Sequence, residues 1–112
     1  MARDGVAARM TPIFHVVLAA DLAWVDDRYE ARTLATEGFV HASYREKVVE
    51  SARLYFPAGA DLRVLEIDPT GLDVRVADTP RGPMPHVHGA IPRSAVVRVH
   101  LISDLDSSSA SK

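Results

Sequence analysis

The sequence predicts a single domain of the α+β class, with about five or six strands and two helices. The chain has 112 residues, which suits one domain with one continuous core. Short apolar runs rich in β-branched residues are separated by turns that contain proline or glycine, as strands are. The stretch after Ser43 instead places its apolar residues at the spacing of a helix.

The composition limits the partners that we expect. Hydrophobic residues make up 47% and charged residues 25% of the chain, and the formal net charge is -2. Such a charge gives no attraction to nucleic acid or to an anionic membrane. No apolar run approaches the ~20 residues that cross a bilayer, and the first residues lack the apolar core of a signal peptide, so we expect a cytoplasmic protein. Cysteine is absent, which excludes disulfides, thiolate metal sites and a cysteine nucleophile.

We expect three regions along the chain. Residues 1–11 are rich in small residues and aperiodic, and residues 103–112 include a run of serines, so both are predicted to be flexible tails. Residues 12–102 contain the strands and helices and form the single α+β domain. No internal repeat and no linker divides this domain.

The first half of the domain is predicted to contain two strands and one short helix. Residues 13–18 form an apolar, β-branched run after a proline, which is typical of a buried strand. Asp21 can cap a short helix over residues 22–25. Residues 29–36 have no clean period and are predicted to form a loop, and residues 38–42 form the second strand.

A longer helix is predicted to begin at Ser43. Ser43 and Glu46 have the spacing of a capping box, in which each side chain bonds the backbone N–H of the other residue. Apolar side chains then recur at helical spacing up to Phe56. The Pro-Ala-Gly sequence at residues 57–59 cannot continue a helix, so the helix should end there.

The second half of the domain is predicted to be mostly extended. Residues 62–68 form a strand that ends in a Pro-Thr-Gly turn, and residues 72–76 can pair with it as a hairpin. Residues 77–85 contain three prolines and a glycine and are predicted to form a loop. Residues 86–91 return briefly to an extended conformation, and residues 95–102 form the final strand.

Histidines in or beside apolar runs are the main candidates for a functional site. His15 lies within the first strand, and His41 ends the second strand close to Ser43. His86 and His88 lie on one face of an extended segment. A histidine and a serine where a strand meets a helix can bind a ligand and exchange protons. A site requires that these side chains converge on one cleft.

Glu66 and three aromatic residues are further candidates. Glu66 lies in the middle of the strand 62–68, where a carboxylate must be exposed, paired or functional. Facing inward, it can hold a ribose hydroxyl or stabilise a developing positive charge; facing outward, it is an ordinary residue of a solvated sheet face. Trp24, Tyr29 and Tyr44 have amphipathic rings that can line a cleft or only cover the core.

The two neighbouring histidines also permit a metal site. The His-x-His pattern of His86 and His88 would need a third ligand, and no carboxylate stands at ligand spacing, so we assign no metal ligand. The sequence lacks the Gly-x-Ser-x-Gly elbow of hydrolases, the phosphate-binding P-loop and the Gly-x-Gly-x-x-Gly motif. A Ser-His-Asp hydrolase is therefore disfavoured.

Four segments together resemble a bacterial family, domain-of-unknown-function family 952. They are Ile-Phe-His at 13–15, Leu-Ala-Thr-Glu-Gly-Phe-Val-His-Ala-Ser at 34–43, Leu-Glu-Ile-Asp at 65–68 and Pro-His-Val-His-Gly-Ala-Ile-Pro at 85–92. The resemblance extends in order and spacing over about residues 13–101. It implies a fold similar to that of ADP-ribosyltransferases, with two small, mainly antiparallel sheets and two or three helices around a nucleotide-type cleft.

The same resemblance implies roles for particular residues. His15 corresponds to the strand histidine that faces the adenosine-side ribose, and residues 38–43 correspond to a strand that leads into a serine-capped helix. The resemblance makes NAD or a related nucleotide one candidate ligand, and we assign no cofactor. Ala42 stands where the family often has a cysteine, and His88 where it often has an aromatic residue. ADP-ribosyltransferases also use a glutamate late in the chain, and no strand after Glu66 contains one.

These observations support three hypotheses. In the first, a histidine-lined cleft binds a nucleotide or phosphorylated metabolite, and imidazoles act as general acid or base. Its catalytic candidates are His15, His41 and Glu66, and its ligand-binding candidates are Ser43, Tyr44, His86 and His88. In the second, the chain is a non-catalytic binding or interaction module that keeps the fold. The third is a histidine metal site. Histidines gathered around one pocket favour the first hypothesis, and dispersed or backbone-bonded histidines favour the second.

Overall fold

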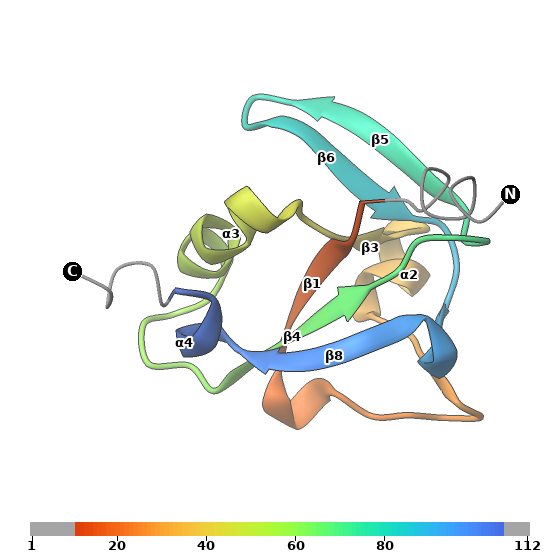
Figure 1. Cartoon of the computed structure of the whole chain (residues 1–112), viewed down its shortest axis with the longest axis horizontal. Helices are drawn as coiled ribbons and strands as arrows, with labels where there is room; N and C mark the ends of the chain where they lie inside the picture. The colour runs from red at the N-terminus through yellow and green to blue at the C-terminus, as the bar shows by residue number, and fades with distance from the viewer. Residues whose placement is uncertain (1–10, 107–112) are drawn as a thin grey trace, which may run out of the picture.

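A three-stranded antiparallel sheet forms the centre of the fold (Figure 1). The computed structural model describes residues 11–106. Strands β1 (Ile13–Leu18), β4 (Leu62–Ile67) and β8 (Val96–Leu101) lie in the order β1-β4-β8. The sequence predicted each of these strands to within a residue or so, because each is a run of about six apolar or alternating residues between turn signals.

A second sheet contains a hairpin that extends away from the central sheet (Figure 1). Its strands are β3 (Val40–His41), β6 (Gly82–Val87) and β5 (Val74–Thr79), in the order β3-β6-β5. The two sheets meet where Phe14 of β1 and Ser43 exchange backbone hydrogen bonds of 2.8 and 2.7 Å. This bridge brings the start of β1 beside the end of β3.

The remaining elements are short. Strands β2 (Arg28–Tyr29) and β7 (Ile91–Pro92) pair with each other as a third sheet. The α-helices are α2 (Arg32–Glu37), α3 (Val48–Tyr55) and α4 (Ile102–Leu105). Three single-turn 3₁₀ helices are η1 (Ala19–Asp21), η2 (Arg45–Lys47) and η3 (Arg93–Ala95). Among residues 11–106, no helix is long and apolar enough to cross a membrane.

The hydrophobic core consists of two clusters, one on each face of the central sheet. Ile13, Leu65 and Ile67 belong to the first cluster, which also contains residues of β2, β3, β6 and β7. Phe14 and Val64, which point to the opposite face, pack with residues of α3 and α4 in the second. Both faces of β4 are therefore covered, and its apolar residues are buried without simple alternation.

The α+β class and the single domain are confirmed, but the strands form three small antiparallel sheets rather than two. The additional sheet is the two-residue pair of β2 and β7. Part of it, Tyr29, lies in the segment 29–36 that was predicted to be a loop, and the same segment contains most of α2. A strand of two residues and a helix of six residues are too short to show a period in the sequence.

Two predicted boundaries in this region were wrong. Gly38 caps the end of α2 in the left-handed conformation, with φ of 88°, so the second strand starts only at Val40. Asp21 is the last residue of η1 and caps no helix, and residues 22–25 are not helical. In both places the local pattern was compatible with more than one assignment.

The predicted pairing of residues 72–76 with 62–68 was also wrong. Both edges of β4 are occupied, by β1 and by β8, so β5 pairs with β6 instead. Most of the segment predicted as a proline-rich loop, 77–85, thus lies in these two strands. The carbonyl of Pro85 accepts from the Ala42 N–H at 3.1 Å, so this edge of Pro85 faces β3. The N–H and C=O of one residue point to the same side of an antiparallel strand, so the N–H that proline lacks would also have faced β3. The hydrogen bonds between β5 and β6 are therefore unaffected.

Ser43 does not cap a helix as the sequence predicted. Its backbone is held in the bridge to Phe14, and the N-cap position of η2 is Tyr44, which makes no side-chain cap hydrogen bond. The helical region therefore begins with η2 and continues as α3. At the C-terminal end, the segment predicted as a tail, 103–112, begins within α4, whose Leu105 is buried. Residues 107–112, like most of the predicted N-terminal tail, lie outside the described residues.

Candidate functional site

A cavity of about 720 Å³ lies where the two larger sheets meet. Its wall is formed by β1, the end of β3, the segment that leads into α2, the second half of α3 and the tip of the β5–β6 hairpin. Aliphatic and aromatic side chains make up much of this wall, and a few polar side chains interrupt them. Small-molecule sites in proteins have this size, between about 300 and 1,000 Å³, and this mixture of side chains.

The cavity brings together four of the seven residues that the first hypothesis assigned to the site. His15, His41, Ser43 and His86 line it. Tyr44, Glu66 and His88 do not belong to its wall. The predicted convergence therefore holds for the first histidine, the strand–helix segment and one histidine of the His-x-His pair.

His15 is buried in the wall of this cavity, and both of its ring nitrogens have partners. Nδ1 lies 2.6 Å from the carbonyl oxygen of His41, and Nε2 lies 2.8 Å from the Tyr29 hydroxyl. A carbonyl only accepts, so Nδ1 carries the hydrogen and Nε2 accepts from Tyr29. Burial lowers the pKa of His15 to about 4, against the opposing effect of the His41 carbonyl. The imidazole is neutral at pH 7 and is not available as a base while Tyr29 is bound to it.

Tyr29 completes this arrangement from β2. Its side chain is buried, and burial raises its pKa to about 12. The phenol therefore stays protonated and donates to His15. The sequence identified Tyr29 only as one of several amphipathic rings, because its partner lies on a strand of a different sheet.

Replacing Tyr29 by phenylalanine is expected to destabilise the protein by about 1–3 kcal/mol. The change removes the only described donor to the buried Nε2 of His15 and leaves that acceptor unpaired. Denaturant unfolding at pH 7 measures the loss. Tyr55→Phe is the matched control: Tyr55 is 68% exposed, so the loss of its surface hydrogen bond with Arg81 should change the free energy of unfolding by less than about 1 kcal/mol. Equal stability of the two variants would contradict the assigned hydrogen bond.

His41 and His86 face each other across β3 and β6. They are register partners, and their ring centroids lie 5.2 Å apart. Phe39 stacks on His86 with ring centroids 4.1 Å apart. Partial burial lowers the pKa of His86, and the neighbouring His41 and His88 lower it further. His86 therefore presents a neutral, aromatic-backed imidazole to the cavity.

His41 is oriented by a carboxylate from the end of α2. Its Nε2 lies 3.0 Å from Oε1 of Glu37. Because the carboxylate accepts, Nε2 carries a hydrogen, and in the neutral ring Nδ1 is then the acceptor. An imidazole held by a carboxylate in this way can take a proton from a bound molecule.

His88 and the metal hypothesis gain no support from this arrangement. The His88 ring contacts Phe39 at 5.3 Å between centroids, and its backbone N–H donates to the Asp73 carbonyl at 2.8 Å. It therefore belongs to the aromatic cluster beside the cavity rather than to the cavity wall. Within the described part of the chain, no group of three or more histidine or carboxylate side chains could hold a metal ion.

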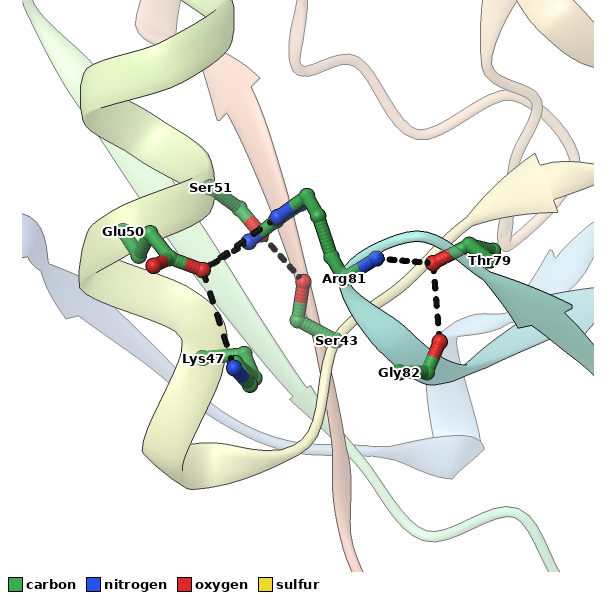
Figure 2. A network of polar contacts seen from close by, with 7 residues as sticks. All are labelled: Ser43, Lys47, Glu50, Ser51, Thr79, Arg81 and Gly82. Carbon is green, nitrogen blue, oxygen red and sulfur yellow. Dashed lines mark hydrogen bonds and ion pairs between the residues drawn. The ribbon is translucent and has the colours of Figure 1, made fainter.

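The cavity wall contains a polar network between α3 and the tip of the β5–β6 hairpin that the sequence did not predict (Figure 2). Ser43 and Ser51 are both buried, and their hydroxyl oxygens lie 2.7 Å apart. Arg81 reaches from the hairpin tip and donates to Ser51 at 3.0 Å and to Glu50 at 2.7 Å. The bond to Glu50 raises the pKa of Arg81 and lowers that of Glu50. Residue 81 lay in a predicted loop, so nothing local indicated that it meets α3.

Glu66 lies on the other face of the central sheet from His15. Its Oε1 is 2.7 Å from Nε2 of His100, on the neighbouring strand β8. Strand alternation places Leu65 on the face of His15 and Glu66 on the face of Phe14. Glu66 therefore does not face a cleft that it shares with His15, and the prediction that it would do so was wrong. Tyr44 packs against the first core cluster.

The fold and the cavity define a small single-domain α+β protein with a ligand-sized cavity between two antiparallel sheets. The chain belongs to the family described as Protein of unknown function (DUF952), whose model matches residues 18–99. This finding confirms the family resemblance seen in the sequence.

Solved structures of one bacterial protein are similar to this chain. The crystal structure of protein CC0527 from Caulobacter crescentus has 27% sequence identity and a TM-score of 0.72, over 81% of this chain and 85% of that chain. Its solution NMR structure has the same identity and a TM-score of 0.64, over 81% of this chain and 84% of that chain. No curated protein matches the chain.

Proposed function

We propose that this protein binds a small molecule, a nucleotide or a phosphorylated metabolite, in the cavity between its two larger sheets. The observation that carries the proposal is the convergence of His15, His41 and His86 on one cavity of about 720 Å³. These residues come from three strands that are distant in sequence. A packed core has no need to gather three imidazoles beside an opening, whereas a site for a polar, aromatic ligand does.

NAD or a related nucleotide is the ligand class that we favour. An ADP-ribosyltransferase-like arrangement would place the ribose near His15 and the strand that leads into a helix at residues 38–43, and both segments line or border the cavity. The stacked pair of Phe39 and His86 offers an aromatic surface beside the cavity for a base.

Binding without catalysis is favoured by the state of His15. Both of its nitrogens are occupied within the protein, and its pKa of about 4 keeps it neutral. A role in holding the shape of the cavity explains these features fully. A catalytic role is the second candidate, and the pair of His41 and Glu37 favours it, because a carboxylate-oriented imidazole on the rim has one nitrogen directed away from its partner.

A thermal-shift series with NAD, ADP-ribose, AMP and ribose 5-phosphate tests the proposal. We expect at least one of these compounds to raise the melting temperature by several degrees at concentrations far above its Kd. The shift should be lost in His41→Gln and His86→Gln. It should persist in His100→Gln, because His100 pairs with Glu66 away from the cavity.

Two outcomes decide between the candidates. If no compound stabilises the wild type, the nucleotide proposal is wrong. If a compound binds, its ¹H NMR spectrum should stay unchanged over hours in the binding model, whereas products that form with the wild type and not with His41→Gln would establish the catalytic candidate.

A further inference from the structure

We infer that one end of the cavity is a subsite for an oxyanion, formed by Arg81, Ser51 and Ser43 (Figure 2). The inference rests on the proposed function and adds to it the position of the charged end of the ligand. The ligand then presents a phosphate or a carboxylate group to the hairpin tip, while its remaining part extends toward the histidines.

One hydroxyl hydrogen of the serine pair is left without an acceptor among the described residues. Two hydroxyl groups carry two hydrogens, and the single contact between Ser43 Oγ and Ser51 Oγ uses one of them. Ser51 Oγ also accepts from Arg81, so that contact uses no hydroxyl hydrogen. Whichever serine donates to the other, one O–H has no acceptor in the hydrogen-bond network of residues 11–106.

This spare donor is buried and lies on the cavity wall. Ser43 is 4% exposed and Ser51 is 6% exposed, and both line the cavity. A buried donor without an acceptor costs free energy, so such groups normally have a partner. A ligand oxygen in the cavity would supply the missing acceptor.

Arg81 adds a positive charge at the same place. Its side chain is only 19% exposed, and it is positioned by two bonds to Glu50 and by the ring of Tyr55, 5.6 Å from the guanidinium carbon. Glu50 also lies 3.9 Å from Lys47, so one carboxylate faces two cations and the site retains positive charge. A planar guanidinium beside a hydroxyl donor matches the geometry of a phosphate or carboxylate group.

The hairpin turn holds Arg81 in this position. Thr79 Oγ1 accepts from the Arg81 backbone N–H at 3.1 Å and donates to the Gly82 carbonyl at 2.8 Å. The Thr79 hydroxyl thus both accepts and donates within the turn and closes it across its ends (Figure 2). The arginine is preorganised by the turn and by Glu50, which lowers the cost of binding an anion.

An NMR titration with inorganic phosphate and with acetate tests the subsite directly. We expect a saturable shift of the Arg81 Nε–Hε resonance in the millimolar range or below. Saturation at a lower concentration of phosphate than of acetate would indicate that the natural ligand presents a phosphate group. The reverse order would indicate a carboxylate. Arg81→Lys and Ser51→Ala should weaken the binding by about tenfold, as followed on the backbone resonances of the hairpin turn. Absence of a saturable shift with either anion overturns the inference.

Arg75→Lys is the matched control for Arg81→Lys. Arg75 lies on the same hairpin and forms an exposed ion pair with Asp73 at 2.9 Å, outside the cavity wall. This variant should bind the anions as the wild type does. Equal losses in both lysine variants would mean that general charge on the hairpin, not the subsite, attracts anions, and would also overturn the inference.

A comparison of AMP with adenosine separates this inference from the proposed function. If AMP binds more tightly than adenosine and Arg81→Lys removes the difference, both are supported. If AMP binds and Arg81→Lys or Ser51→Ala has no effect, the subsite is wrong and the proposed function stands. If phosphate binds at Arg81 and no nucleotide binds, the subsite stands and the nucleotide class is wrong.

Discussion

Lowering the pH from 7 to about 4 is expected to destabilise the wild-type protein by about 3 kcal/mol more than the His15→Gln variant. The cause is the buried His15, whose pKa falls from 6.5 to about 4 on folding. Between these two pH values the unfolded chain binds a proton at His15 that the folded protein does not. The contribution of His15 to the free energy of unfolding is therefore largest above pH 6.5 and decreases as the pH falls to about 4. It levels off at lower pH, where His15 is protonated in both states.

Glutamine is the suitable replacement because it does not titrate and still offers one donor and one acceptor. Denaturant unfolding of both proteins at several pH values measures the effect. The lowered pKa values of His86, Glu50 and Asp73 also reduce stability in acid, but they are present in both proteins and cancel in the comparison. Parallel pH profiles would show that His15 is not a buried neutral imidazole, and its assigned hydrogen bonds would then be wrong.

Replacing Leu65 by alanine is expected to cost about 2–5 kcal/mol of stability. Leu65 is fully buried on β4, where β1 and β8 flank it and the first core cluster covers it. The truncation leaves a cavity next to His15, its register partner on β1. Since small domains have only about 5–15 kcal/mol of net stability, this is a large fraction of the total.

Val99→Ala is the matched control for this core substitution. Val99 is the register partner of Leu65 on β8 and points to the same face, but it is 45% exposed. Its replacement should cost less than about 1 kcal/mol. Chemical denaturation of both variants at pH 7 gives the comparison, and losses of similar size would mean that the first core cluster does not extend over β4 in the way described.

The candidate site was partly predictable from the sequence. His15 and His41 are conspicuous because a histidine within or beside an apolar run is unusual and must be satisfied or used. The sequence offered Tyr29 only as an aromatic ring that could line a cleft or cover the core, and it did not indicate Arg81 or Ser51 as site residues. Each of these reaches the cavity through a contact with an element distant in sequence, and no local pattern carries that information.

The same contrast applies to the fold. Residues 13–18, 62–67 and 96–101 could be assigned to strands because hydrophobic period and turn residues act locally. The partner of residues 72–76 could not be assigned from local pattern, because pairing depends on which sheet edges are free, and both edges of β4 were taken by β1 and β8. Ser43 shows the same effect, since its capping pattern gave way to a bridge with Phe14.

Local physical chemistry thus predicted the α+β class, the main strands and the histidines that could form a site, and the resemblance of four segments gave the family. Only the tertiary structure decided that Glu66 faces away from the cavity and that Arg81 faces into it. A strand's period shows which residues share a face, but which face is inward depends on what packs against it. In this chain both faces of β4 are covered, and the cavity is lined by β1, β3, α3 and the β5–β6 hairpin.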